Sequence, residues 1–464
     1  MQQDIVQWRK IAIPEEFLVT RKGFHGSLSP DKPNLESFTF GGDIRIGDLT
    51  GDGRVDFLVY RSTEGRVTGT QPGGLKPTFI GAFDMDGEPL WSVGGGGNSP
   101  SRPGPVAVYD MTGNGTEDVV HFWHKPGDGE DVNRLSHADV VVQIRNGSTG
   151  EVIREAAPDV ITQQTAKDSI SPNRPTLHQR ILIANFRGMN RPRDFVIKLN
   201  NTYIAMTDEL EVLWTYAPEG TFQRPYHLAY IPAVGDLDGD GKDELFGGYF
   251  VTDDDGTEVW KEKLAPNMDS VRIAEWDGAN RAIASGYGCV LSGDGEVILK
   301  LGEDLVPHGQ EVRVADFHSG YEGNEMVLRA YGHKPDVHLI SSEHNRIVST
   351  VELQSSPTNV GMEPVYWDGP NERALLHNGG WLWNMEQGEG VPLPDLPPAK
   401  GSEIHRMSFY HVIPANIVGD KREELVMWDQ MGQYVYVYAH APVEESSSLE
   451  YEHGERQYNP RLMD

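Results

Sequence analysis

Residues 231–250 read IPAVGDLDGDGKDELFGGYF, with a short apolar segment on each side of a turn rich in Asp and Gly. Two apolar segments joined by such a turn predict a pair of antiparallel strands. The arrangement recurs along the chain, plainly in three further segments and more weakly in four. The plain copies are 44–60, 106–123 and 181–199, and the weaker ones are 271–288, 312–332, 363–380 and 415–429. Because internal repeats decide the fold of a repetitive chain, these eight copies are the main guide to the architecture.

A second hairpin signal follows five of the copies. It reads DMDGEPLW (84–91), NGSTGEVI (146–153), TDELEVLW (207–214), DDDGTEVW (253–260) and SGDGEVIL (292–299). Each unit therefore supplies four antiparallel strands, and eight such units predict an all-β fold with a single eight-bladed β-propeller. Seven blades are the alternative if one weak copy is an insertion.

We expect residues 1–464 to form one propeller domain with a closed ring. Residues 5–13 lie in an N-terminal segment, 1–40, that we expect to help close the last blade beside residues 432–441. Such sharing removes the free edge strands that an open solenoid would expose. Residues 442–464 form a C-terminal tail.

Composition excludes several classes of protein. The 464 residues carry a formal net charge of −30, which repels phosphate backbones and disfavours nucleic-acid binding. No apolar run reaches the length of a membrane helix, and the single cysteine, Cys289, excludes an internal disulfide framework. The N-terminal residues lack the apolar region of a signal peptide. We expect a cytoplasmic protein if Met1 is the native start, a secreted or periplasmic one if a signal peptide was removed, and a monomer.

Three of the Asp-rich turns have the spacing of a linear calcium loop. Ca²⁺ prefers six to eight oxygen ligands, and alternating oxygen donors around a glycine kink can wrap one ion. The predicted ligands are Asp48, Thr50, Asp52 and Asp56 in the first loop, Asp110, Thr112, Asn114 and Asp118 in the second, and Asp236, Asp238, Asp240 and Glu244 in the fourth. We expect structural Ca²⁺ in up to three blades and ordinary turns in the other five, although turns closed by Asp side chains without metal have the same signature.

The opposite rim of the ring collects histidine, arginine and tyrosine. Residues just before each innermost strand and residues at the end of each second strand meet there. The first set includes Arg102, His178, Arg180, Tyr226, His227, Asp269, His308 and Glu363, and the second includes His121, His124, Tyr249, Arg329, Tyr331 and His333. Proton-transfer groups and cations gathered in an acidic chain predict a site for an anionic ligand on this face.

The chain resembles a known group of enzymes in its strongest repeats. YHLAYIPAVGDLDGDGKDELFGGYFVTDDDGTEVW (226–260), HGQEVRVADF (308–317), NEMVLRAYGH (324–333) and QYNPRLMD (457–464) are similar to the FG-GAP-like propellers of family 11 rhamnogalacturonan lyases. Related ulvan and rhamnose–glucuronate lyases are propellers of similar size. The resemblance implies a lyase that cleaves a rhamnose- and uronate-containing plant or algal glycan by β-elimination at the uronic acid.

The resemblance also suggests roles for residues on the rim. Elimination requires a base for the C5 proton, a proton donor for the departing O4 and a cation that neutralises the uronate carboxylate. We expect His121 or His178 as base, Tyr226 or Tyr249 as donor, and Arg180 with Arg329 on the carboxylate. Residues that would bind the rest of the substrate are His124, His227, His308, Tyr331, His333 and Arg102.

Two other functions remain open from the sequence. One is a non-catalytic propeller that binds a glycan or a protein. The other is a glycoside hydrolase, which normally needs two carboxylates flanking the bond. The rim positions offer only Asp269 and Glu363, two blades apart, which favours the lyase.

Overall fold

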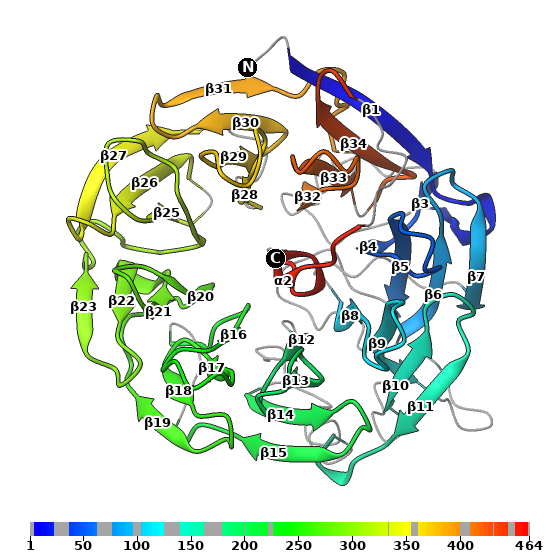
Figure 1. The fold of residues 1–464 in the computed structure, drawn as a ribbon, viewed down its shortest axis with the longest axis horizontal. Coiled ribbons are helices and arrows are strands. Elements are labelled where there is room, and N and C mark those ends of the chain that lie inside the picture. The colour runs from blue at the N-terminus through cyan, green and yellow to red at the C-terminus, as the bar shows by residue number, and fades with distance from the viewer. Residues whose placement is uncertain are drawn as a thin grey trace.

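Eight four-stranded antiparallel sheets surround a central channel in the computed structural model (Figure 1). The structure describes residues 4–22, 37–62, 77–95, 104–124, 140–161, 179–199, 201–220, 226–332, 334–353, 361–399, 409–429, 431–443 and 451–462. Within these residues the two inner strands of each four-stranded sheet come from one of the eight repeats. The prediction of an all-β, eight-bladed propeller is confirmed, and no blade has to be discounted as an insertion.

The strands keep the same order in each blade. The innermost strands are β4 (Asp43–Gly47), β8 (Val106–Tyr109), β12 (Arg180–Ala184), β16 (Ala233–Gly235), β20 (Val271–Glu275), β24 (Val312–Ala315), β28 (Glu363–Val365) and β32 (Tyr410–Ala415). The second strands are β5 (Asp56–Ser62), β9 (Asp118–His124), β13 (Asp194–Leu199), β17 (Glu244–Phe246), β21 (Asn280–Ala284), β25 (Glu325–Arg329), β29 (Leu375–Asn378) and β33 (Glu424–Asp429).

The outer half of each blade is the second hairpin. The third strands are β6 (Pro77–Phe83), β10 (Val140–Asn146), β14 (Thr202–Thr207), β18 (Phe250–Thr252), β22 (Cys289–Leu291), β26 (Asp336–Ser341), β30 (Trp381–Asn384) and β34 (Tyr434–His440). The outermost strands are β7 (Pro89–Gly94), β11 (Val152–Ala156), β15 (Val212–Tyr216), β19 (Glu258–Lys261), β23 (Val297–Lys300), β27 (Arg346–Glu352), β31 (Glu389–Pro392) and β1 (Ile5–Ala12).

The two ends of the chain share the eighth blade. β1 pairs with β34 as the outermost strand of the sheet β1-β34-β33-β32, from Ile5 opposite His440 to Ala12 opposite Tyr434. The amide of Ala441 also donates to the carbonyl of Asp4 at 2.7 Å. This pairing closes the ring with main-chain hydrogen bonds. Without β1, strand β34 would be an unpaired edge strand of the last blade.

The remaining elements are short. A 3-10 helix (Glu15–Phe17) leads into the hairpin of β2 (Val19–Lys22) and β3 (Ser37–Phe40), a second 3-10 helix spans Gly286–Gly288, and α2 (Glu455–Tyr458) lies in the channel. No helix within the described ranges has both the length and the apolar character that a membrane crossing requires.

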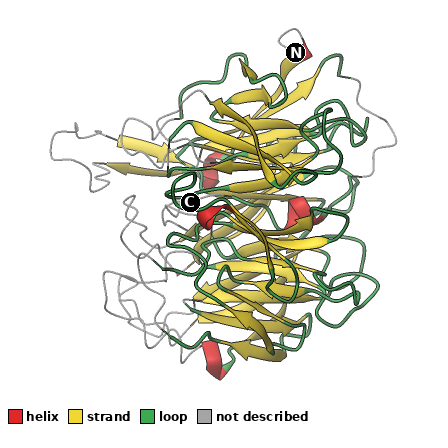
Figure 2. Cartoon of the chain, turned by 90° about the vertical axis from the view of Figure 1, so that its left-hand side faces the viewer, coloured by secondary structure: helices red, strands yellow, loops and turns green. Residues whose placement is uncertain are grey.

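Burial falls from the inside of each blade to the outside. β12 and β13 are buried at every position, whereas the outermost β15 is exposed at three of its five residues. Inner strands pack against neighbouring blades on both faces, which explains why they are apolar runs rather than alternating ones. Figure 2 shows the blades from the side, stacked around the ring.

Tryptophans of the outer strands fasten one blade to the next. The indole Nε1 of Trp214 donates to the carbonyl of Asp254 at 2.6 Å, and that of Trp260 donates to Gly293 at 3.1 Å. Gly256 packs directly on Trp214: a Cβ there would lie 2.8 Å from the indole, and its φ of +84° favours glycine. The recurring spacing of Gly and Trp in these hairpins therefore serves contacts between blades.

Candidate functional site

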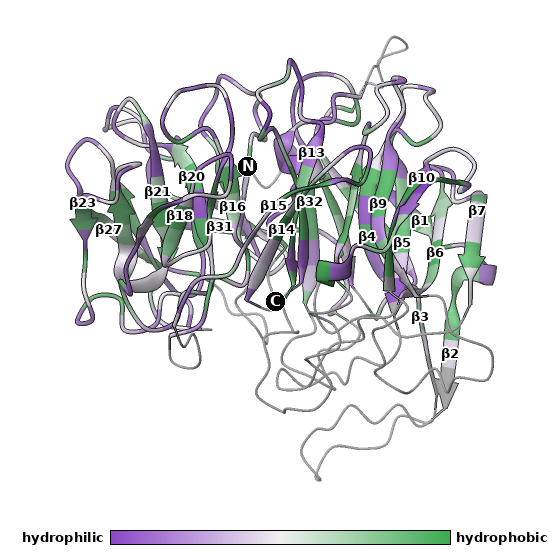
Figure 3. Cartoon of the chain, turned by 90° about the horizontal axis from the view of Figure 1, so that it is seen from below, coloured by the Kyte–Doolittle hydropathy of each residue, from purple (hydrophilic) through white to green (hydrophobic). Residues whose placement is uncertain are grey.

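The two rims of the ring have different contents. The Asp-rich loops join the first and second strands at one rim, and the ends of the second strands and the starts of the inner strands form the other. Figure 3 shows this ring edge-on, with apolar strands between polar loops, and the β2–β3 hairpin extending beyond one rim. We call the first the Asp-loop rim and the second the His–Tyr rim.

A carboxylate lies between two imidazoles on the His–Tyr rim. Asp269 Oδ1 is 3.3 Å from His227 Nε2, and Asp269 Oδ2 is 3.5 Å from His308 Nε2. Asp269 is buried, whereas the side chain of His308 is 38% exposed. A buried carboxylate beside an exposed imidazole orients the ring and fixes which of its nitrogens faces outward, as in a histidine that acts as a general base.

Tyrosines surround these histidines. Tyr230 stacks on His227, with ring centroids 4.2 Å apart and planes 8° from parallel. Tyr331 is 49% exposed, pairs with His308 through an isolated β-bridge, and has its ring centroid 6.5 Å from that imidazole. Tyr331 is therefore the most exposed of the described tyrosines that contact these histidines.

The main chain fixes where Asp269 lies. The amides of Tyr230 and Ile231 both donate to the Asp269 carbonyl, at 3.0 and 3.3 Å, and Ile231 forms a parallel bridge with Ser270. The segment before β16 is thus tied to the segment before β20. Adjacent blades contribute His227 and Asp269, so the contact depends on the packing of the ring.

Both ring nitrogens of His227 face oxygen atoms. Its Nδ1 faces the carbonyl of Leu228 at 3.2 Å, while its Nε2 faces the Asp269 carboxylate. The His227 side chain is 13% exposed, against 38% for His308. His308 is therefore the better placed of the two to meet a substrate.

Several residues predicted for the chemistry lie in the interior. His121 is fully buried in β9, where Arg145 Nε donates to its Nε2 at 3.0 Å and its Nδ1 lies 2.7 Å from the Phe122 carbonyl. Burial lowers the pKa of His121 to about 3. Neither ring nitrogen of His121 is open to a substrate in this structure, which argues against its role as the base.

Arg329 and Tyr249 are also enclosed. The guanidinium of Arg329 donates to Glu311 Oε2 at 3.1 Å and to the Lys334 carbonyl at 2.7 Å, and burial lowers its pKa. The Tyr249 hydroxyl donates to the carbonyl of Ala265, and burial raises its pKa. These placements assign Arg329 and Tyr249 to the scaffold beneath the rim.

The other predicted residues divide into two groups. Arg180 begins β12, is largely buried and donates to the Gln179 carbonyl at 2.9 Å, while Tyr226 is half-buried with its ring centroid 6.5 Å from that of Tyr249. Arg102, His178 and His333 lie outside the described residues. His124 ends β9, and its side chain is likewise outside them.

Tyr230 is a residue of the cluster that the sequence did not reveal. It belongs to no repeat, although it lies in the aromatic-rich stretch before β16.

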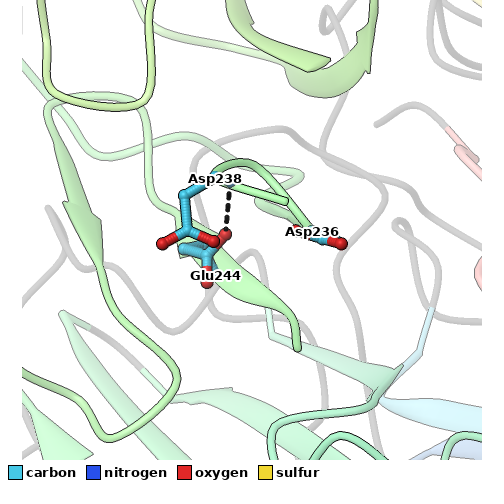
Figure 4. A group of neighbouring side chains, drawn as sticks. All are labelled: Asp236, Asp238 and Glu244. Atoms are coloured by element: carbon cyan, nitrogen blue, oxygen red, sulfur yellow. Dashed lines mark hydrogen bonds between the residues drawn. The ribbon is translucent and has the colours of Figure 1, made fainter. Parts of the chain in front are cut away.

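The fourth Asp-rich loop gathers three carboxylates. Oxygens of Asp236, Asp238 and Glu244 all lie within 4.8 Å of one another (Figure 4). Glu244 Oε2 accepts the amides of Leu237 and Asp238 at 2.6 and 3.3 Å, while Oε1 is buried without a hydrogen-bond partner. Burial raises the pKa of Glu244 to about 8. An unpartnered buried oxygen among carboxylates fits a bound cation. Asp240 turns away, with Lys242 Nζ 3.7 Å from its carboxylate.

In the first and second loops the Asp side chains accept hydrogen bonds from main-chain amides of the same loop. Asp48 accepts the amides of residues 51, 52 and 53, and Asp110 accepts those of 113, 114 and 115. Asp56 and Asp118 accept from Thr50 and Thr112. Within the described residues neither loop brings three carboxylates together, so calcium there stays a prediction.

In the third loop an arginine side chain, Arg187, lies among the carboxylates. Arg187 Nε donates to Asp194 Oδ1 at 2.7 Å, and Arg187 Nη2 donates to Asp208 Oδ1 at 2.8 Å. Asp194 occupies the position that Glu244 has in the fourth loop, as the first residue of the second strand. A guanidinium therefore pairs with the buried acid in this blade.

Comparison with known proteins identifies the family. The profile of rhamnogalacturonan lyase family 11, C-terminal domain, matches residues 198–458. The chain belongs to this family. The match includes His227, Tyr230, Asp269, His308 and Tyr331, and also the fourth Asp-rich loop.

Two curated relatives of this family-11 chain are lyases from Bacillus subtilis strain 168. Rhamnogalacturonan endolyase YesW is 23% identical over 85% of this chain and 66% of its own length, and rhamnogalacturonan exolyase YesX is 22% identical over 89% and 73%. The chain thus spans just under two thirds of YesW.

Solved structures share the fold. The PL11 rhamnogalacturonan lyase of Bacillus licheniformis superposes with a TM-score of 0.66 at 21% identity, over 96% of this chain and 77% of that one. The YesW crystal structure gives a TM-score of 0.65 at 20% identity, over 91% and 75%.

Proposed function

We propose that this family-11 chain is a polysaccharide lyase that cleaves rhamnogalacturonan by β-elimination at the uronic acid. The supporting observation is the His227–Asp269–His308 cluster with exposed Tyr331, on the part of the chain that matches the family. Relatives that are named rhamnogalacturonan lyases support the substrate. The His–Tyr rim is the proposed site, because it brings the exposed side chains of His308 and Tyr331 together with the buried carboxylate of Asp269.

The proposed base is His308. Asp269 orients the His308 ring through Nε2, so Nδ1 is the nitrogen that accepts the C5 proton of the uronate. The carbanion electrons form the C4–C5 double bond as the C4–O4 bond breaks. Tyr331 donates its proton to O4, and the proton on His308 later restores the phenol. The step consumes no water and no redox equivalent.

A cation must face the substrate carboxylate, because an ionised carboxylate disfavours the carbanion. His227, whose ring nitrogens face Leu228 O and Asp269, adds a hydrogen-bonding group to the cluster. Lys263 is exposed, and its ammonium lies 5.6 Å from the centre of the Tyr226 ring. We assign Lys263 to the uronate, and Arg180 stays the arginine candidate for the same task.

The fourth Asp-rich loop is the proposed calcium site. Asp236, Asp238 and Glu244 would hold the ion, which would neutralise the buried Glu244 and stabilise the turn between β16 and β17. This loop lies on the rim opposite the proposed chemistry. Calcium therefore serves stability, and elimination proceeds without a step at the metal.

Glycoside hydrolysis is less well supported. Glu363, the second carboxylate that hydrolysis would need, accepts Arg313 Nε and Nη2 at 2.9 and 2.7 Å with a single oxygen and is buried. Asp269 is already engaged by two imidazoles. Neither carboxylate is placed to flank a glycosidic bond.

The test is ultraviolet absorbance of the unsaturated uronate after incubation with rhamnogalacturonan, ulvan or gum arabic, with and without calcium chelation. We expect absorbance to rise with rhamnogalacturonan, and chelation to act only through slow loss of folded protein. No rise with any glycan, from folded and calcium-loaded protein, would contradict the proposal. An immediate loss of rate on chelation, with the protein still folded, would place the metal in the reaction.

A further inference from the structure

The C-terminal residues 451–462 lie in the middle of the ring (Figure 1) and form hydrogen bonds with all eight blades. The contacts are hydrogen bonds to groups in or next to the innermost strands. In blade order the groups are Gly53 O, Val108 O, Ile183 N and O, Pro232 O, Val271 O, Arg313 Nη2, Pro364 O and Pro414 O. The segment is therefore an internal plug that registers the eight blades against one another.

The plug ends beneath the His–Tyr rim. Tyr451 bonds next to the Asp-loop rim, whereas Arg461 reaches the segments that precede β16 and β20. Arg461 Nη1 donates to the Pro232 carbonyl at 2.6 Å, and Nη2 donates to Ile231 at 3.2 Å and to Val271. One guanidinium thus joins two adjacent blades at the level of the candidate site.

These carbonyls adjoin the residues of the cluster. Ile231 and Pro232 directly follow Tyr230, which stacks on His227, and Val271 comes two residues after Asp269. The same two segments are joined by the amides of Tyr230 and Ile231 on the Asp269 carbonyl. Main-chain hydrogen bonds between these two segments therefore set the distance between His227 and Asp269. Arg461 binds carbonyl groups of both segments on the side that faces the ring centre.

The chemistry of Arg461 suits this task. Its side chain is almost fully buried, no carboxylate lies within ion-pair distance among the described residues, and burial lowers its pKa. Carbonyl oxygens are its partners, and a planar fork can reach three of them where a lysine ammonium cannot. A buried guanidinium bound to carbonyl groups is weak evidence for stability, and its contacts here fix the geometry of the two segments.

We propose that Arg461 is a positioning residue of the active site, which fixes the segments 226–231 and 269–271 relative to each other. Its effect on catalysis rests on the proposed lyase function, whereas its effect on the two segments does not. The contact of Asp269 with His227 and His308 is the feature that its loss would loosen.

The test compares the full-length variants Arg461→Lys and Arg461→Ala with Gln457→Ala. Gln457 is the matched control, because it is a buried side chain of the same plug whose Nε2 donates to Pro414 O at 2.7 Å in the eighth blade, away from the site. Hydrogen–deuterium exchange of peptides covering 226–232 and 269–272 is the first measurement. Loss of a charged hydrogen bond corresponds to roughly tenfold or more in local opening.

We expect both Arg461 variants to exchange about tenfold faster in these two segments only, and Gln457→Ala to leave them unchanged. In the absorbance assay kcat should fall about tenfold or more with KM changed less than about threefold, since the substrate groups remain. Unchanged exchange in the two segments, or equally faster exchange in all blades, would overturn the proposal. If the wild-type protein eliminates no glycan, the lyase function fails while the exchange result still decides the role of Arg461.

Discussion

The two rims of the propeller are built by opposite rules. On the Asp-loop rim, the first residue of the second strand is an acid in six blades, and its carboxylate accepts amides from the start of the loop. These acids are Asp56, Asp118, Asp194, Glu244, Glu325 and Glu424. On the His–Tyr rim, His227, Asp269 and His308 come from the segments before three successive inner strands, β16, β20 and β24. The recurring acids support the turns, whereas this cluster joins three neighbouring blades at the proposed site.

The largest effect should come from the base. Replacing His308 with Ala removes the proton acceptor, and we expect kcat to fall by about 10² to 10⁴ with little change in thermal stability. His344 is the matched control, because its side chain is also 38% exposed but lies in the β26–β27 hairpin at the opposite rim. His344→Ala should keep full activity. Equal losses of kcat in His308→Ala and His344→Ala would contradict the placement of the active site on the His–Tyr rim.

The next largest effect should be a loss of stability when Arg187 of the third loop is replaced. Replacing Arg187 with Met leaves buried Asp194 and Asp208 without their shared partner, and we expect unfolding to become easier by about 2 kcal/mol, since Arg187 itself is partly exposed. Denaturant unfolding measures this change. Activity per folded molecule should stay unchanged. A loss of activity without a loss of stability would mean that this rim takes part in the reaction.

The fourth loop should respond to calcium and pH together. The pKa of Glu244, raised to about 8, lies above the value of an unfolded glutamate, so without metal this group favours folding at low pH. That contribution is lost as the pH rises from about 4.5 to about 8. Because metal binds the deprotonated form, added Ca²⁺ should raise Tm by a few degrees at pH 8 and much less at pH 5.

Glu424 is the control for the calcium effect. Its pKa is also raised to about 8 by burial, and its carboxylate accepts the amides of Ile417 and Val418. Glu244→Gln should abolish the response of Tm to Ca²⁺, while Glu424→Gln should keep it. A response that survives in Glu244→Gln would place the ion elsewhere.

The smallest effect should come from the Trp contacts between blades. Trp214→Phe keeps the packing on Gly256 and loses the hydrogen bond to Asp254, which is worth about 1 kcal/mol. Equilibrium unfolding should show this small loss, with unchanged kcat and KM. A loss of several kcal/mol would mean that the indole does more than fasten neighbouring hairpins.

The sequence predicted what the repeat encodes. The eight blades, the hairpins and the acids of the fourth loop follow from spacing that recurs, and the His–Tyr rim follows from strand direction. It could not tell exposed residues of that rim from buried ones. The side chains of His121 and Arg329 are buried. His121 is hydrogen-bonded to Arg145 and Arg329 to Glu311, and these partners lie 24 and 18 residues away along the chain, where spacing gives no sign of the contact. Tyr230 and Arg461 lie in segments outside the repeat, so no period marks them.

The most direct test of lyase chemistry at the His–Tyr rim is the mass balance of the cleavage of a rhamnogalacturonan oligosaccharide of known length. In β-elimination no water is added, so the masses of the two products sum to that of the substrate. Wild-type protein and His344→Ala should give this balance, and His308→Ala should leave the oligosaccharide uncut over the same time. Products whose masses sum to substrate plus one water would contradict the account, as would full cleavage by His308→Ala.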